Sequence, residues 1–169
     1  PLNSALALLR VSGDGVFSIA DELFSKRVSG IKERRILVGY LSDEGKRIDQ
    51  VVLLVYPNPR SITGEDMLEI CCHGSMLIVD EIVRAFLSRG ASYATRGEFT
   101  ARAFYNGKMD LIEAEAVNDL INATTQEGKN LALLSLSGST SKMVAPLKEK
   151  IASLLALLEV NIDYPEYTD

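Results

Sequence analysis

The chain has 169 residues, of which 47% are apolar and 24% are charged, and its formal net charge is −5 at pH 7. This apolar content excludes a disordered chain. The negative charge argues against a protein that binds nucleic acid mainly through its overall charge, although a local basic patch is compatible with it. No run of about 18 apolar residues occurs, and we therefore predict no membrane span. The neighbouring thiols of Cys71 and Cys72 disfavour a structural disulfide and favour a reducing compartment. Composition thus predicts a globular cytoplasmic protein of one or two domains.

The composition changes near Thr100. Nine of the 12 glycines lie in the first 100 residues. This glycine content is typical of a turn-rich domain of strands and helices. The remainder is poor in glycine and reads as helical. We therefore predict an α+β fold, with a small mixed-sheet domain over residues 1–100 and an antiparallel helical domain, a partial bundle, over residues 101–169.

Hydrophobic periodicity predicts the elements of the first domain in chain order. Apolar runs and period-two alternation predict strands, and apolar positions three and four residues apart predict helices. Asp43-Glu44-Gly45 is typical of the turn of a hairpin. The expected strands are residues 5–11, 36–41, 48–56 and 67–73. One helix is expected to begin near residue 16. A second helix is expected over about residues 75–89, with Leu77, Ile78, Ile82 and Phe86 facing inward.

The second domain is expected to be entirely helical. Asp110 and Glu113 have the spacing of a capping box, ahead of a helix that would bury Leu111, Ala114, Val117, Leu120 and Ile121. Residues 125–162 continue the helical pattern, with an interruption at Gly138. Pro146 should either begin a new helix or kink a continuous one.

Three segments carry residues that packing alone does not require. Arg10 ends the first apolar run, where it could reach solvent or bind an anion with its forked donors. Glu69 shares a strand face with Met67 and Cys71, where it could face water or accept two donors from a flat heterocycle such as a pterin or guanine ring. Lys108 follows the Asn106-Gly107 turn, where it could be solvated or could neutralise a carboxylate of a ligand.

Other kinds of site are disfavoured. His73 is the single histidine, and we expect a structural role for it because a metal site needs about three or four ligands. The phosphate-binding patterns GxxxxGK[ST] and GxGxxG are both absent from the 169 residues. We therefore expect no metal site, no catalytic residue and no GTP hydrolysis in this chain by itself.

Four segments in order, LLRVSG (8–13), SITGEDMLEICCHGS (61–75), GEFTARAFYNGKMDLIEAEAV (97–117) and NIDYPE (161–166), resemble the MnmE family, also called TrmE, of tRNA-modification GTPases. The resemblance implies an N-terminal domain that binds a tetrahydrofolate derivative, for example 5-formyltetrahydrofolate, and forms a homodimer. It also implies a helical domain that is truncated here before an inserted GTPase domain, where GTP, magnesium and potassium would bind.

The same resemblance implies an activity and partners. The family installs an aminomethyl-type group on carbon five of the wobble uridine of certain tRNAs, together with the FAD- and NADH-dependent protein MnmG (GidA). The folate-site arginine, glutamate and lysine of the family correspond to Arg10, Glu69 and Lys108. Ser75 and Arg96 stand where the family usually has glycine and proline.

Two other functions compete with this one. A non-catalytic assembly module that does not bind folate would account for the apolar stripe at Leu147, Ile151, Leu154, Leu155 and Leu158, which needs partner helices. A standalone folate-dependent aminomethyltransferase is disfavoured because nothing after the helical segment would close an active site.

Overall fold

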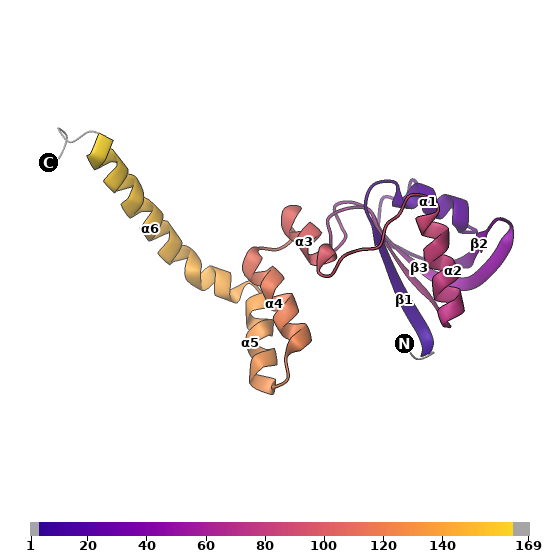
Figure 1. The fold of residues 1–169 in the computed structure, drawn as a ribbon. Helices are drawn as coiled ribbons and strands as arrows, with labels where there is room; N and C mark the ends of the chain where they lie inside the picture. Colours follow the sequence, from indigo (N-terminus) through magenta and orange to yellow (C-terminus); the bar gives the residue numbers. More distant parts are fainter. Residues whose placement is uncertain (1–3, 164–169) are drawn as a thin grey trace. The chain divides into compact units, whose positions relative to one another are not determined.

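The structure is a computed structural model that describes residues 4–163 (Figure 1). It divides into two compact units, with the boundary between Lys108 and Met109. The boundary predicted at Thr100 falls inside α3 (Glu98–Tyr105), which belongs to the first unit.

The first unit has four strands and three helices, and these confirm the predicted α+β class. Its remaining elements are β1 (Ser4–Ser12), α1 (Val16–Leu23), β2 (Arg35–Asp43), β3 (Lys46–Tyr56), β4 (Met67–Gly74) and α2 (Met76–Leu87). The strands form one sheet in the order β1-β4-β3-β2, and each neighbouring pair is antiparallel. The expectation of a mixed sheet is therefore wrong for the described residues. Both the hairpin and the loop after β3 reverse the chain, and β1 pairs antiparallel with the outer edge of β4.

The hydrophobic core lies between one face of the sheet and helices α1 and α2 (Figure 1). Leu68, Ile70 and Cys72 of β4 are at most 1% exposed, and Ile82 and Phe86 of α2 pack in the same cluster. Burying a side chain of this size contributes about 1.5–3 kcal/mol, and this helix-covered face accounts for much of the stability of the unit. The alternation predicted for β4 is thereby confirmed. We call the opposite side of the sheet the open face.

Two local features explain where these elements turn and pack. Glu44 and Gly45 connect β2 to β3, and both have positive φ (46° and 77°), as a type I′ hairpin turn requires. Helix α2 buries Ile82, Ala85 and Phe86. The prediction that Leu77 faces inward is wrong. This side chain is 69% exposed, because it lies on the first turn and outside the row that contacts the sheet.

The second unit contains α4 (Leu111–Asn122), α5 (Gln126–Leu136) and α6 (Ser139–Asp163). The predicted capping box is present: Asp110 accepts from the Glu113 amide at 2.8 Å, and the Glu113 carboxylate accepts from the Asp110 amide at 2.8 Å. Pro146 lies inside a continuous α6 and does not begin a new helix. The expected burial of Leu111 and Ile121 is wrong, because both side chains are more than half exposed.

No helix within residues 4–163 combines the length and the apolar character needed to cross a membrane.

The buried carboxylate of Asp49, on β3, fixes the end of β4 through hydrogen bonds. It accepts hydrogen bonds from the His73 amide (2.8 Å), from the Gln50 amide (2.8 Å) and from His73 Nδ1 (2.8 Å). Burial raises the pKa of Asp49, but the hydrogen bonds from His73 and Gln50 outweigh it and hold the pKa below its ordinary value. The histidine thus has the structural role expected from the sequence.

We expect Asp49→Asn to lower the free energy of unfolding at pH 7 by about 1–3 kcal/mol, because an amide cannot accept all three hydrogen bonds. A depressed carboxyl pKa stabilises the fold above the ordinary pKa of about 4, and this contribution is lost as the pH falls through the folded-state pKa. The difference between wild type and variant, measured by urea denaturation, should therefore shrink below about pH 4. The exposed Asp80→Asn on α2 is the control and should change stability little. An unfolding free energy of Asp49→Asn equal to that of this control at pH 7 would contradict the prediction.

Candidate functional site

Arg10 and Glu69 form an ion pair across β1 and β4 on the open face of the sheet. The strand register places the two residues directly opposite each other. Arg10 Nε donates to Glu69 Oε1 at 2.9 Å, and Arg10 Nη2 contacts the same oxygen. The Glu69 side chain is only 12% exposed, whereas that of Arg10 is 34% exposed. Two of the three residues singled out in the sequence are therefore in direct contact.

Tyr56, at the end of β3, engages the other oxygen of the same carboxylate. Its hydroxyl donates to Glu69 Oε2 at 3.0 Å. Burial raises the pKa of Tyr56, and the neighbouring Glu69 carboxylate raises it further. The phenol therefore stays protonated and acts as the donor. Both oxygens of Glu69 have a partner, which compensates for placing a carboxylate in a largely covered position.

The Arg10 guanidinium also lies 5.5 Å from the centroid of the Phe99 ring on α3. This cation–π contact holds the cation between an aromatic ring and a carboxylate. An arginine in this environment is oriented even without a ligand, which reduces the entropy that binding would cost.

Lys108 lies in the connection between α3 and α4 and contacts the loop that leads from β3 to β4. Its ammonium donates to the Pro59 carbonyl at 2.8 Å. Its stem packs against Gly64, where φ is +79° and an added Cβ would come within 3.1 Å of the lysine methylenes. Among residues 4–163, no hydrogen bond or ion pair joins Lys108 to Arg10 or Glu69. The structure thus places the third predicted residue at the neighbouring loop and outside the ion pair.

Arg102 connects α3 to the end of β1 and to the loop before β4. Its Nη1 donates to Glu65 Oε1 at 3.0 Å, and its Nη2 donates to Glu98 Oε1 at 2.8 Å. Glu65 in turn accepts from the Ser12 hydroxyl at 2.9 Å. Hydrogen bonds from the Thr95 amide and Arg102 hold the pKa of Glu98 below its ordinary value, and the pair stays ionised. Through α3, this network positions Phe99 beside Arg10.

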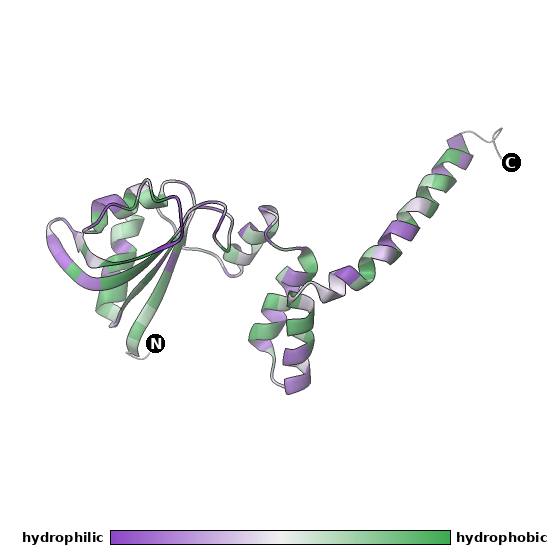
Figure 2. Ribbon diagram, turned by 180° about the vertical axis from the view of Figure 1, so that it is seen from behind, coloured by the Kyte–Doolittle hydropathy of each residue, from purple (hydrophilic) through white to green (hydrophobic). Residues whose placement is uncertain are grey.

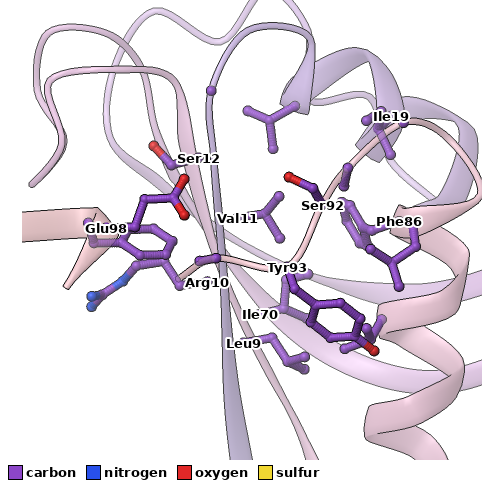
Figure 3. Close-up of a pocket in the computed structure, with 18 of the residues that line it drawn as sticks. Leu9, Arg10, Val11, Ser12, Ile19, Ile70, Phe86, Ser92, Tyr93 and Glu98 are labelled. Carbon is purple, nitrogen blue, oxygen red and sulfur yellow. The ribbon is translucent and has the colours of Figure 1, made fainter. Parts of the chain in front are cut away.

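A cavity of about 450 Å³ lies between β1, α2 and residues 90–94 (Figure 3). Leu9, Ile70 and Phe86 give it an apolar floor, and Tyr93 lies along its side. Arg10, Glu98 and Arg102 are among the lining residues, but Glu69 and Lys108 are not. The cavity and the ion pair therefore share Arg10 and are otherwise distinct features of the unit.

The two adjacent cysteines point to opposite faces of β4. Cys72 is 1% exposed in the core, and burial raises the pKa of its thiol, with a further contribution from the charge of Asp49. Cys71 is half-buried on the open face, and both thiols are free. No group of three or more potential metal ligands occurs within residues 4–163.

Tyr56 and Phe99 were not identified from the sequence. Strand alternation places Tyr56 on the same face of β3 as Leu54, and Leu54 pairs with Glu69. That register would have indicated Tyr56, but it follows from the pairing of two strands and cannot be read from either one alone. Phe99 carries no comparable signal, because its position depends on how α3 packs.

The comparisons with known proteins agree with this division of the chain. The family described as "GTP-binding protein TrmE N-terminus" matches residues 1–108, and the family described as "MnmE helical domain" matches residues 111–169. The chain belongs to the MnmE family. Together the two matches cover all of the sequence except residues 109 and 110.

Several curated members of the MnmE family are similar to the chain over its whole length. The tRNA modification GTPase MnmE of Mycoplasma genitalium is 42% identical over 171 residues, which cover 100% of this chain and 38% of that protein. The proteins of the same name from Geobacillus kaustophilus and Thermotoga petrophila are 43% and 42% identical, and in each case 98% of this chain and 37% of the relative are covered. The chain thus spans less than two fifths of the length of these relatives.

We expect Arg102→Met to loosen α3, because Glu65 and Glu98 lose their shared cation. The side chain of Arg102 is 38% exposed, and its loss should therefore cost about 1–2 kcal/mol. The amide protons of α3 should then exchange about tenfold faster in native-state hydrogen exchange. Arg96→Met, two residues before the helix and exposed, is the matched control. Equal exchange rates in the two variants would show that the network does not hold α3.

Proposed function

We propose that the first unit binds a tetrahydrofolate derivative, with Arg10, Glu69 and Lys108 as the binding residues. The observation that carries the proposal is a carboxylate, Glu69, held nearly covered on a sheet face by one arginine and one tyrosine. Membership of the MnmE family supports it, because the resemblance of these motifs implies a folate site at the same three residues.

The chemistry of Glu69 suits the amino-pyrimidinone edge of a pterin. That edge presents two parallel N–H donors, and a carboxylate accepts such a pair through its two oxygens. Tyr56 occupies one acceptor site on Oε2, and Arg10 binds Oε1, which leaves lone pairs on the carboxylate. Arg10 and Tyr56 together keep the carboxylate oriented for these two donors.

Arg10 and Lys108 supply the positive charge that a folate requires. The benzoylglutamate part of the ligand carries carboxylates, and both cations are accessible at the margin of the site. Glu69 would therefore select the heterocycle, and the two cations would hold the anionic part. No residue of the first unit is assigned a catalytic role.

We propose further that the unit forms a homodimer through the open face of the sheet. Apolar side chains on this face are exposed in the described chain, among them Leu6 (68%), Leu8 (57%), Ile36 (68%) and Val38 (48%). These side chains belong to the two edge strands, β1 and β2, and exposed apolar residues on both edges of one sheet face are typical of a protein interface. Because Glu69 lies on the same face, the dimer would bring a second subunit close to the proposed folate site.

The activity of the complete protein is a proposal of the same kind. The MnmE relatives are named tRNA modification GTPases. We infer that the complete protein modifies carbon five of the wobble uridine together with MnmG in the cytoplasm. The folate derivative would provide the one-carbon unit. GTP hydrolysis, with magnesium and potassium, would occur in a GTPase domain, because these 169 residues contain no GxxxxGK[ST] pattern.

A non-catalytic assembly module remains the alternative, and helix α6 favours it. Hydrophobic residues recur along the whole length of the helix (Figure 2), and Leu147, Leu154 and Leu158 are each more than half exposed. A helix with this pattern needs a partner surface. Folate binding by the first unit distinguishes the two functions, because an assembly module requires none.

We expect Glu69→Gln to weaken the binding of 5-formyltetrahydrofolate by about 10- to 100-fold, since a neutral amide cannot accept both pterin donors. Isothermal titration calorimetry of the purified chain would measure this. Glu81→Gln, which neutralises an exposed carboxylate on α2, is the control and should bind like the wild type. Undiminished affinity of Glu69→Gln would overturn the assignment of Glu69. Absence of binding by the wild type would favour the assembly module.

We expect Leu8→Lys combined with Val38→Lys to convert a dimer into monomers in sedimentation velocity, because two charges would be buried in the interface. Both side chains are already exposed, and the variant should therefore stay folded. Leu77→Lys, which adds a charge to the exposed side of α2, is the control. A wild-type chain that sediments as a monomer would contradict the proposed dimer, and a dimer that both variants preserve would place the interface elsewhere.

A further inference from the structure

Basic side chains gather around the short loop that follows β3. Arg34 Nε donates to the Arg60 carbonyl at 2.7 Å, and Lys108 Nζ donates to the Pro59 carbonyl at 2.8 Å. Arg35, the neighbour of Arg34 in the chain, begins β2. We call Arg34, Arg35, Arg60 and Lys108 the basic patch. All four are exposed.

The charges of the basic patch are not neutralised by ion pairs within the described part of the chain. The Arg34 side chain contacts a carbonyl oxygen and an aromatic ring, Lys108 contacts a carbonyl oxygen, and no ion pair within residues 4–163 involves Arg34, Arg60 or Lys108. The nearby Asp66 accepts from the Asn58 amide at 2.8 Å and caps the loop. A cluster of cations without ion-pair partners, on a chain of net charge −5, is suited to the binding of an anionic ligand.

The basic patch begins where the proposed pterin site ends. Tyr56 donates to Glu69, and the Arg34 guanidinium lies 5.9 Å from the centroid of the same Tyr56 ring. Arg34 Nε in turn donates to the main-chain carbonyl of Arg60. One continuous series of contacts therefore leads from the carboxylate that would hold the heterocycle to Arg34 and to the loop that carries Arg60.

We propose that the basic patch binds the γ-linked polyglutamate tail of a folate whose pterin lies at Glu69. The inference rests on the proposed folate site. Each added glutamate brings one free carboxylate, and the planar guanidinium groups of Arg34 and Arg60 offer forked donors that match it. The patch is exposed, as the binding of a tail that extends into solvent requires. Lys108 contacts the same loop through the Pro59 carbonyl and belongs both to the basic patch and to the proposed folate-binding residues.

The alternative anion, the phosphate backbone of RNA, is less well supported by these contacts. The patch contains four cations beside a proposed small-molecule site, and the chain as a whole is acidic. Binding of a nucleic acid through phosphates needs many such contacts and is strongly weakened by salt. Direct measurement of tRNA binding separates the two anions.

The test compares 5-formyltetrahydrofolate that carries one glutamate with the same compound that carries three, titrated into the wild type and into Arg34→Gln combined with Arg60→Gln. We expect the triglutamate to bind the wild type about tenfold more tightly at low salt, and this advantage should decrease as salt is added. The double variant should bind the monoglutamate like the wild type and should lose the advantage. Arg84→Gln combined with Lys129→Gln removes the same charge elsewhere and should keep it.

Each other outcome overturns the proposal in a recognisable way. Equal affinity of the wild type for both compounds refutes the polyglutamate site and leaves the folate site intact. Absence of binding by both compounds refutes the folate site and the inference together. If the double variant keeps the triglutamate advantage but loses affinity for tRNA, the basic patch is a surface for RNA.

Discussion

The antiparallel register of β1 and β4 is the constraint on which the site depends. It places a guanidinium opposite a carboxylate, on a sheet face that also carries apolar side chains. A slip of one residue in β1 would turn Arg10 toward the helix-covered core and expose Leu9 in its place. The cost of burying an unpaired charge and of exposing a core residue thus favours the observed register over its neighbours. The ion pair and the core stabilise the same pairing.

The remaining parts of the site are held by polar contacts between β1, the loop before β4 and α3. Ser12, Glu65, Arg102 and Glu98 form a chain of hydrogen bonds that begins at the end of β1 and finishes on α3. None of these groups belongs to the proposed ligand contacts, yet they determine where Phe99 lies. Supporting residues of this kind would preorganise the proposed ligand contacts, and the precision of such a site depends on them as much as on the residues that touch the ligand.

Much of the fold could be predicted from local patterns, and the failures have a physical cause. The alternation along β4 placed Ile70 in the core because the period of a strand is two. The strand direction was wrong because pairing between β1 and β4 joins segments far apart in the chain. The burial of Leu111 was wrong because an apolar position on a helix needs a neighbouring element to cover it, and periodicity does not identify that element.

For the candidate site, residue chemistry singled out Arg10, Glu69 and Lys108 as candidates, but it did not show how they are arranged. The ion pair follows from sheet register, and the contact of Lys108 with Pro59 follows from the path of a loop. Tyr56 was missed because a tyrosine at a strand end is common, and only its distance from Glu69 gives it a role.

The neighbouring cysteines make the open face accessible to a chemical probe. Cys72 is covered by the core and has a raised pKa, and a thiol reagent would react slowly with it. Cys71 lies two residues along β4 from Glu69 and on the same face, where it is partly accessible. A single fluorophore or spin label could therefore be placed next to the ion pair without any substitution. Its spectrum would report directly on whether a ligand or a second subunit covers that part of the sheet.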